Sequence, residues 1–130
     1  MKKETQEWFK IAREDLQAAE HLFDKDLYRM VCYHSQQAVE KVCKAILVEK
    51  GIEVPRTHNI FDLVSAIKKL GFKPKFKEED AIFLNSIYRS RYPSALGLLP
   101  GGEPTLGDAK KALGVAQGVV TWAQKIKSFR

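Results

Sequence analysis

A helical repeat of apolar side chains over residues 28–46 is the feature that most constrains the fold. At about 100° per residue, one side of such a helix collects apolar and small residues: Tyr28, Val31, Cys32, Ser35, Ala38, Val39, Val42 and Ile46. The opposite side collects polar residues: Tyr33, Gln37, Glu40, Lys41 and Lys44, with His34 at the boundary. Solubility needs only charged groups, so a face that adds a phenol, an imidazole and an amide indicates a binding site or an interface.

The rest of the chain repeats the helical period, and no segment shows the alternation of a half-buried strand. We expect five helices, at residues 5–24, 27–50, 59–71, 78–91 and 105 to about 130. Gly51 is a good left-handed helix end, Asn59 can cap the third helix, and Thr105 with Asp108 fits a capping box. The sequence therefore predicts an all-α fold, an up-and-down antiparallel bundle of about five helices.

The length of 130 residues suits one compact domain, residues 1–130, with a single core. We expect apolar residues from all the long helices in that core: Trp8, Val39, Ile46, Leu84, Tyr88, Val119 and Ile126. No apolar run approaches the roughly 20 residues that span a bilayer, and the first residues are too polar for a signal peptide. We therefore expect a cytoplasmic protein with no membrane association.

The formal net charge of +6 permits an anionic partner such as RNA, a nucleotide or an acidic protein. Lys and Arg are spread along the chain, so a merely soluble basic surface is an equally good interpretation.

Cysteine and histidine spacing gives no sign of a disulfide or a metal site. Cys32 and Cys43 lie about 16 Å apart on one helix, too far for a disulfide, and we expect both to be buried. The three histidines, at positions 21, 34 and 58, lack the paired spacing of metal ligands. We expect neither a metal nor another cofactor.

Arg91 falls in the middle of the apolar face of the fourth predicted helix. A buried guanidinium needs a carboxylate, a phosphate or carbonyl groups as partners, and Glu40 is the natural candidate. Alternatively, Arg91 lies at a frayed helix end and reaches water. Gly114 and Gly118 inside the last helix each cost about 1 kcal/mol relative to Ala. Close packing explains such a cost, either inside the chain or against a second copy of it.

Together these residues resemble the HEPN domain, named for a nucleotide-binding domain of higher eukaryotes and prokaryotes. The resemblance rests on Trp8, on Asp15-Leu16, on the segment at 33–41, on His58, and on Arg91-Tyr92-Pro93. It covers nearly the whole chain. It implies a helical bundle, usually dimeric, that is often encoded with a minimal nucleotidyltransferase in toxin–antitoxin-like pairs.

Many members of that family are metal-independent ribonucleases with an Arg followed after four to six residues by a His. Here the positions that follow Arg91 at this spacing are Leu96, Gly97 and Leu98, and no His occurs after His58. The acid–base partner of that route is absent, so we assign no catalytic residues.

We predict a nucleotide- or RNA-binding module that acts with a minimal nucleotidyltransferase partner and forms a homodimer. The expected ligand-binding residues line a groove between the second and fourth helices: Tyr33, His34, Gln37, Glu40, Lys41, Lys44, Arg91 and Tyr92. Two alternatives stay open: a divergent endoribonuclease that uses His34 or His58, and a purely structural dimerisation domain.

Overall fold

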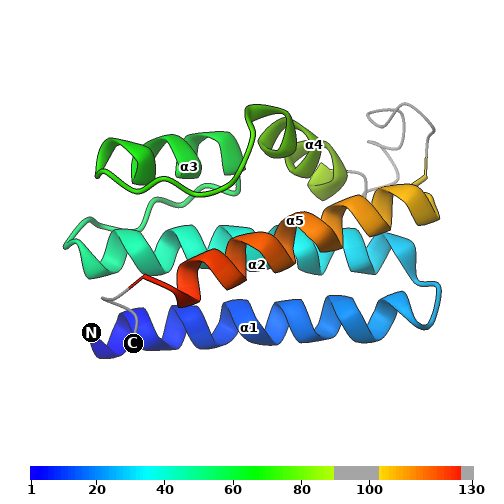
Figure 1. Cartoon of the computed structure of the whole chain (residues 1–130), viewed down its shortest axis with the longest axis horizontal. Helices are drawn as coiled ribbons and strands as arrows, with labels where there is room; N and C mark the ends of the chain where they lie inside the picture. Colours follow the sequence, from blue (N-terminus) through cyan, green and yellow to red (C-terminus); the bar gives the residue numbers. More distant parts are fainter. Residues whose placement is uncertain (90–102, 127–130) are drawn as a thin grey trace.

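The structure, a computed structural model, describes residues 1–89 and 103–126, without the side chains of residues 88 and 89. The expected site residues Arg91 and Tyr92 lie outside these ranges. The described residues form five helices and no strand, which confirms the all-α prediction (Figure 1). The helices are α1 (Lys3–Phe23), α2 (Tyr28–Glu49), α3 (Ile60–Lys69), α4 (Glu78–Arg89) and α5 (Leu106–Gln124).

The ends of the helices follow from local sequence chemistry. After α2 the chain turns at Gly51, whose φ of +74° is the left-handed conformation expected there. The side chain of Asn59 accepts a hydrogen bond from the backbone N–H of Asp62 at 3.3 Å and begins α3. Thr105 and Asp108 form the predicted capping box, with reciprocal bonds of 3.2 and 2.9 Å, and begin α5.

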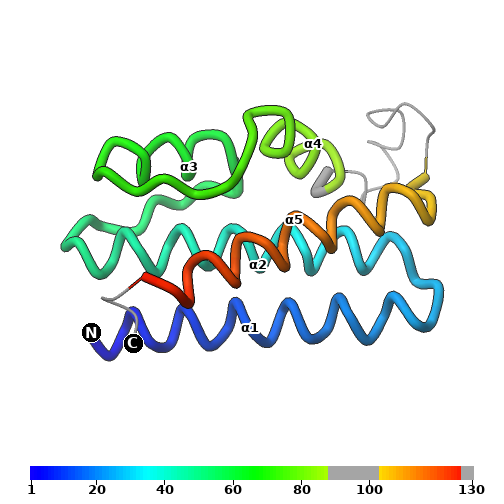
Figure 2. The backbone as a smooth tube through the Cα atoms, viewed as in Figure 1, coloured from blue at the N-terminus to red at the C-terminus, as the bar shows by residue number. Residues whose placement is uncertain are grey.

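Helix α2 is the centre of the bundle and contacts all four other helices. It runs beside α1, while α3 and α4 lie on its other side and α5 crosses it (Figures 1 and 2). Four of the seven predicted core residues are buried: Val39, Ile46, Leu84 and Val119. Trp8 and Ile126 are partly buried against this core, and the side chain of Tyr88 is outside the described atoms.

The two glycines in α5 do not serve close packing against the part of the chain that the structure describes. A Cβ atom added to Gly114 or Gly118 would meet no described heavy atom within 4 Å beyond its own helix turn, and both residues are exposed. As far as residues 1–89 and 103–126 are concerned, the explanation by internal packing is therefore wrong. Packing against a second copy of the chain stays a prediction.

Among the described helices, none is both long enough and apolar enough to cross a membrane.

Candidate functional site: a polar network on the central helix

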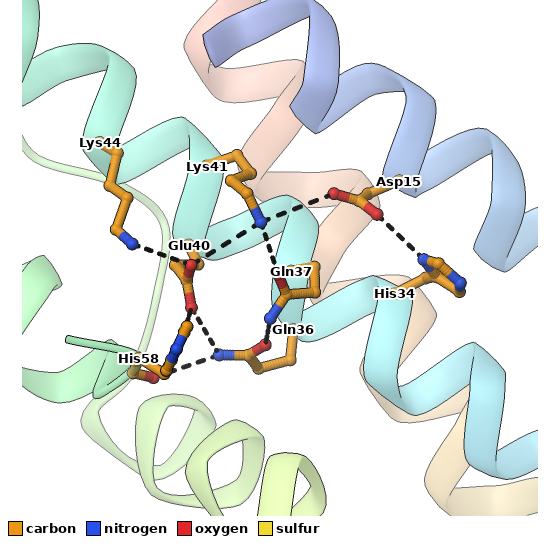
Figure 3. A network of polar contacts seen from close by, with 8 residues as sticks. All are labelled: Asp15, His34, Gln36, Gln37, Glu40, Lys41, Lys44 and His58. Carbon is orange, nitrogen blue, oxygen red and sulfur yellow. Dashed lines mark hydrogen bonds and ion pairs between the residues drawn. The ribbon is translucent and has the colours of Figure 1, made fainter. Parts of the chain in front are cut away.

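The polar side chains of α2 lie inside the protein. Gln36, Glu40, Lys44 and Gln37 are 0%, 1%, 6% and 7% exposed, respectively. The polar face of α2 is covered because neighbours pack on more than one side of this helix. The segment before α3 contributes His58 and α1 contributes Asp15 (Figure 3). Trp8 of α1 also lies in this region.

Glu40 is the centre of the network. Its Oε2 accepts a hydrogen bond from the Lys44 amine at 3.0 Å, and its Oε1 lies 2.8 Å from Nδ1 of His58. The Gln36 amide donates to the same Oε1 at a longer 3.4 Å, and the Lys41 amine lies 3.7 Å from Oε2. A carboxylate buried to this degree is tolerated only when it is paired and hydrogen-bonded, and both conditions hold here.

A chain of amide contacts connects Glu40 to the rest of α2. Lys41 donates a hydrogen bond to the Gln37 carbonyl oxygen, and the Gln37 amide donates to Oε1 of Gln36 at 2.7 Å. The Gln36 amide in turn donates to the backbone carbonyl of His58 at 3.2 Å. These bonds hold the segment before α3 against α2 through both the backbone and the side chain of His58.

The other end of the network reaches α1. Asp15 lies 2.9 Å from Nδ1 of His34, and its second oxygen is 4.0 Å from the Lys41 amine (Figure 3). The side chains of Asp15 and Lys41 are each 16% exposed and that of His34 is 24% exposed. This end is therefore partly open to solvent, whereas the Glu40–Lys44 pair is closed off.

Opposing effects act on the pKa of Glu40. Burial raises it, but the hydrogen bonds from His58 and Lys44 and the charges of Lys44 and Lys41 lower it, and the net effect is a lowered pKa. Glu40 is therefore an anion at neutral pH.

Aromatic rings flank both ends of the network. The Lys44 amine lies 5.7 Å from the centre of the Trp8 ring, which adds a cation–π contact to its pair with Glu40. The rings of Tyr33 and His34 lie 5.1 Å apart in an edge-on arrangement.

The structure thus brings together five of the expected site residues, His34, Gln37, Glu40, Lys41 and Lys44, and places Tyr33 beside them. Sequence reasoning missed Asp15 and Gln36, and it did not place His58 on Glu40. Asp15 carried a usable signal, because it lies seven residues after Trp8 and so two turns along the same face of α1.

Within the described residues, no group of three or more His, Cys, Asp or Glu side chains could hold a metal ion. Cys32 and Cys43 are both free and buried, and burial raises the pKa of each thiol to about 12. Both thiols therefore stay protonated at neutral pH and are poor nucleophiles.

Comparison with known proteins identifies the sequence pattern. A family model described as HEPN domain matches residues 5–126. A solved structure from Thermus thermophilus is 26% identical, with a TM-score of 0.81 over 95% of this chain and 98% of that chain. An archaeal HEPN homologue is 25% identical, with a TM-score of 0.66 over 95% and 97% of the two chains. A HEPN domain protein from Thermotoga maritima shares the fold at 21% identity, with a TM-score of 0.68 over 94% and 98%. A search of curated proteins found no match.

Proposed function

Because the chain belongs to the HEPN domain family, we propose that it is a nucleotide- or RNA-binding module. We place the ligand at the open end of the polar network, where Asp15, His34 and Lys41 are partly exposed beside Tyr33. This is the observation that carries the proposal: polar groups held in fixed positions by buried partners remain accessible to a ligand beside an aromatic ring. Such an end offers ring and amine contacts to a base and a phosphate.

The charges of the network decide how an anion would bind there. Lys41 and Lys44 are matched by Asp15 and Glu40, so the four side chains carry no net charge together. Lys44 is buried and stabilises the network through its ion pair with Glu40. The Lys41 amine, in contrast, is 4.0 Å from the Asp15 carboxylate, a long distance for an ion pair. We therefore assign the phosphate contact to Lys41 and His34, and the arginine fork to Arg91, which follows α4.

The resemblance to the family also supports a protein partner. We propose that the chain acts with a minimal nucleotidyltransferase in a toxin–antitoxin-like pair. The partner is tested by whether an adjacent gene encodes such an enzyme and whether the two proteins co-purify.

Calorimetry with mononucleotides and short RNAs tests the site. We expect Lys41→Ala and Arg91→Ala to weaken binding about tenfold or more each, since a charge-assisted contact contributes roughly 1.5–3 kcal/mol. The matched control is Lys110→Ala, because Lys110 is an exposed lysine on α5. The proposal is contradicted if the wild type binds no member of the panel. It is also contradicted if both site variants bind as tightly as the wild type.

One observation favours a second function, RNA cleavage. When Nδ1 of His34 donates to Asp15, at 2.9 Å, Nε2 is left with a lone pair that can accept the proton of a ribose 2′-hydroxyl. Incubating structured and unstructured RNA with the protein tests it. We expect intact RNA, because the Arg–His spacing of the family's nucleases is incomplete; cleavage that His34→Ala abolishes would establish the second function instead.

A further inference from the structure

Residues 68–77, the end of α3 and the connection to α4, form a second basic feature that the polar network does not use. This lysine segment contains five lysines and no acidic residue, in a chain whose net charge is +6. The basic residues are therefore less evenly spread than the sequence analysis supposed. The lysines are Lys68, Lys69, Lys73, Lys75 and Lys77, and all five are exposed.

The fold turns the lysines outward by anchoring the residues between them. Phe76 is buried at 7% exposure, and Phe72 packs against the core with its ring 6.5 Å from that of Trp122 in α5. Exposed and covered residues alternate from 72 to 77, and Pro74 favours extended geometry at the residue before it. Lys73, Lys75 and Lys77 are consequently exposed at every second position of one connection. Figure 2 shows the path of this connection between α3 and α4.

These lysines are not paired with any acidic residue in the described part of the chain. None of the five makes an ion pair with a described residue, whereas Lys41 and Lys44 do. The acidic residues that follow, Glu78 to Asp80, lie in the first turn of α4, where the helix dipole favours them. Asp80 also accepts a hydrogen bond from the backbone N–H of Lys77 at 3.1 Å. Lys50 adds a sixth amine nearby, 5.5 Å from the centre of the Phe72 ring.

We infer that the lysine segment binds the phosphate backbone of single-stranded RNA. Two residues of extended chain span at most about 7 Å, which is comparable to the separation of successive phosphates in an extended strand. Amines at that repeat can contact consecutive phosphates without reading bases. A membrane-binding segment would insert its aromatic side chains, but Phe72 and Phe76 are turned inward.

This inference rests on the proposed function and extends it: the polar network would bind one nucleotide unit, and the lysine segment would select polynucleotides over mononucleotides. Lys68 and Lys69 also complement the α3 dipole, so they are left unchanged in the test. The test variant is the triple substitution Lys73→Gln, Lys75→Gln and Lys77→Gln. The matched control removes the same charge from exposed lysines elsewhere: Lys10→Gln, Lys25→Gln and Lys110→Gln.

Fluorescence anisotropy with a single-stranded RNA of about 12 nucleotides, repeated at several salt concentrations, gives the readout. Each lost phosphate contact reduces the slope of log affinity against log salt by roughly 0.7 for a single strand. We therefore expect the test variant to lose about two units of slope and at least tenfold in affinity, and the control to match the wild type. Circular dichroism of both variants is used to check that they are folded.

Equal RNA affinity in the test and control variants overturns the inference, as does a wild type that binds no RNA. Stronger, segment-dependent binding to phosphatidylserine vesicles than to RNA overturns it in favour of a membrane surface. ATP separates this inference from the proposed function, because the network is proposed to bind a single nucleotide, whereas the lysine segment is proposed to bind consecutive phosphates of a strand. Suppose that Lys41→Ala binds ATP and RNA with wild-type affinity, whereas the test variant loses affinity for RNA. The proposal for the polar network then fails, and the inference about the lysine segment holds.

Discussion

The imidazole of His58 lies 2.8 Å from the carboxylate of Glu40 and joins the segment before α3 to the middle of α2. Glu40 is 1% exposed, whereas the side chain of His58 is 55% exposed. The pair therefore spans from the interior to the surface. Lys44 binds the other oxygen of the same carboxylate and also contacts the ring of Trp8 in α1. Glu40 therefore connects α1, α2 and the segment before α3.

Substituting Glu40 tests whether this carboxylate holds the network. We expect Glu40→Gln to lower the free energy of unfolding by roughly 3–5 kcal/mol, because it leaves the Lys44 amine buried without its counter-charge. Urea denaturation measures the change. Glu53→Gln, at an exposed position, is the control and should change stability by less than about 0.5 kcal/mol. Equal stability of the two variants would show that Lys44 does not depend on Glu40.

The lowered pKa of Glu40 predicts acid sensitivity. An unfolded glutamate titrates near pH 4.5, so between that pH and the lower pKa of the folded state the unfolded chain binds more protons. The stabilisation by Glu40 is thus complete above pH 4.5 and is lost as the pH falls through the folded-state pKa.

Unfolding free energies at about pH 7 and about pH 3.5 measure this loss, which should be smaller in Glu40→Gln than in the wild type. It should not vanish, because a hydrogen bond from the backbone N–H of Lys2 also lowers the pKa of Glu49. Parallel pH profiles for the wild type and the variant would contradict the prediction.

The fold could be predicted from the sequence because its determinants are local. Helical periodicity, the cap at Asn59, the Thr105–Asp108 box and the turn at Gly51 each depend on residues a few positions apart. Burial of Val39 and Leu84 followed from the same periodicity.

The network could be predicted only in part, because it depends on how many neighbours cover one helix. A projection of α2 separates its faces, but it does not show that α1 and the segment before α3 enclose the polar one. Asp15 is 19 residues from His34, and His58 is 18 residues from Glu40, so no local pattern predicts either of these pairs. The Gln36–Gln37 contacts depend in addition on the backbone carbonyl of His58.

Two apolar residues on α4 give a matched test of the core. Leu84 is fully buried, whereas Ile82 is 56% exposed on the same helix. We expect Leu84→Ala to cost roughly 2–4 kcal/mol of stability through lost burial and the cavity left behind. Ile82→Ala should cost less than about 1 kcal/mol. Thermal and urea unfolding compare them, and similar losses in both variants would mean that α4 packs differently.

The exposed glycines of α5 make a final prediction about the monomer and the dimer. A Cβ at Gly114 or Gly118 would meet no atom within 4 Å from the described residues outside its own helix turn. Each Gly→Ala change should therefore stabilise the monomer by about 0.5–1 kcal/mol, since alanine is the better helix former.

A larger side chain at these positions should weaken the dimer if a second copy of the chain packs on the glycines. Leu in place of Gly118 would then fill the space that the partner helix needs, and self-association should weaken at least tenfold while the helical content stays the same. Gly107→Ala, near the start of α5, is the comparison, because the added Cβ would make only an ordinary 3.6 Å contact with Thr105. Light scattering and analytical ultracentrifugation at micromolar concentration measure the association. A wild type that is monomeric under these conditions rules out the homodimer. A wild-type dimer that Gly118→Leu leaves intact places the interface on another helix.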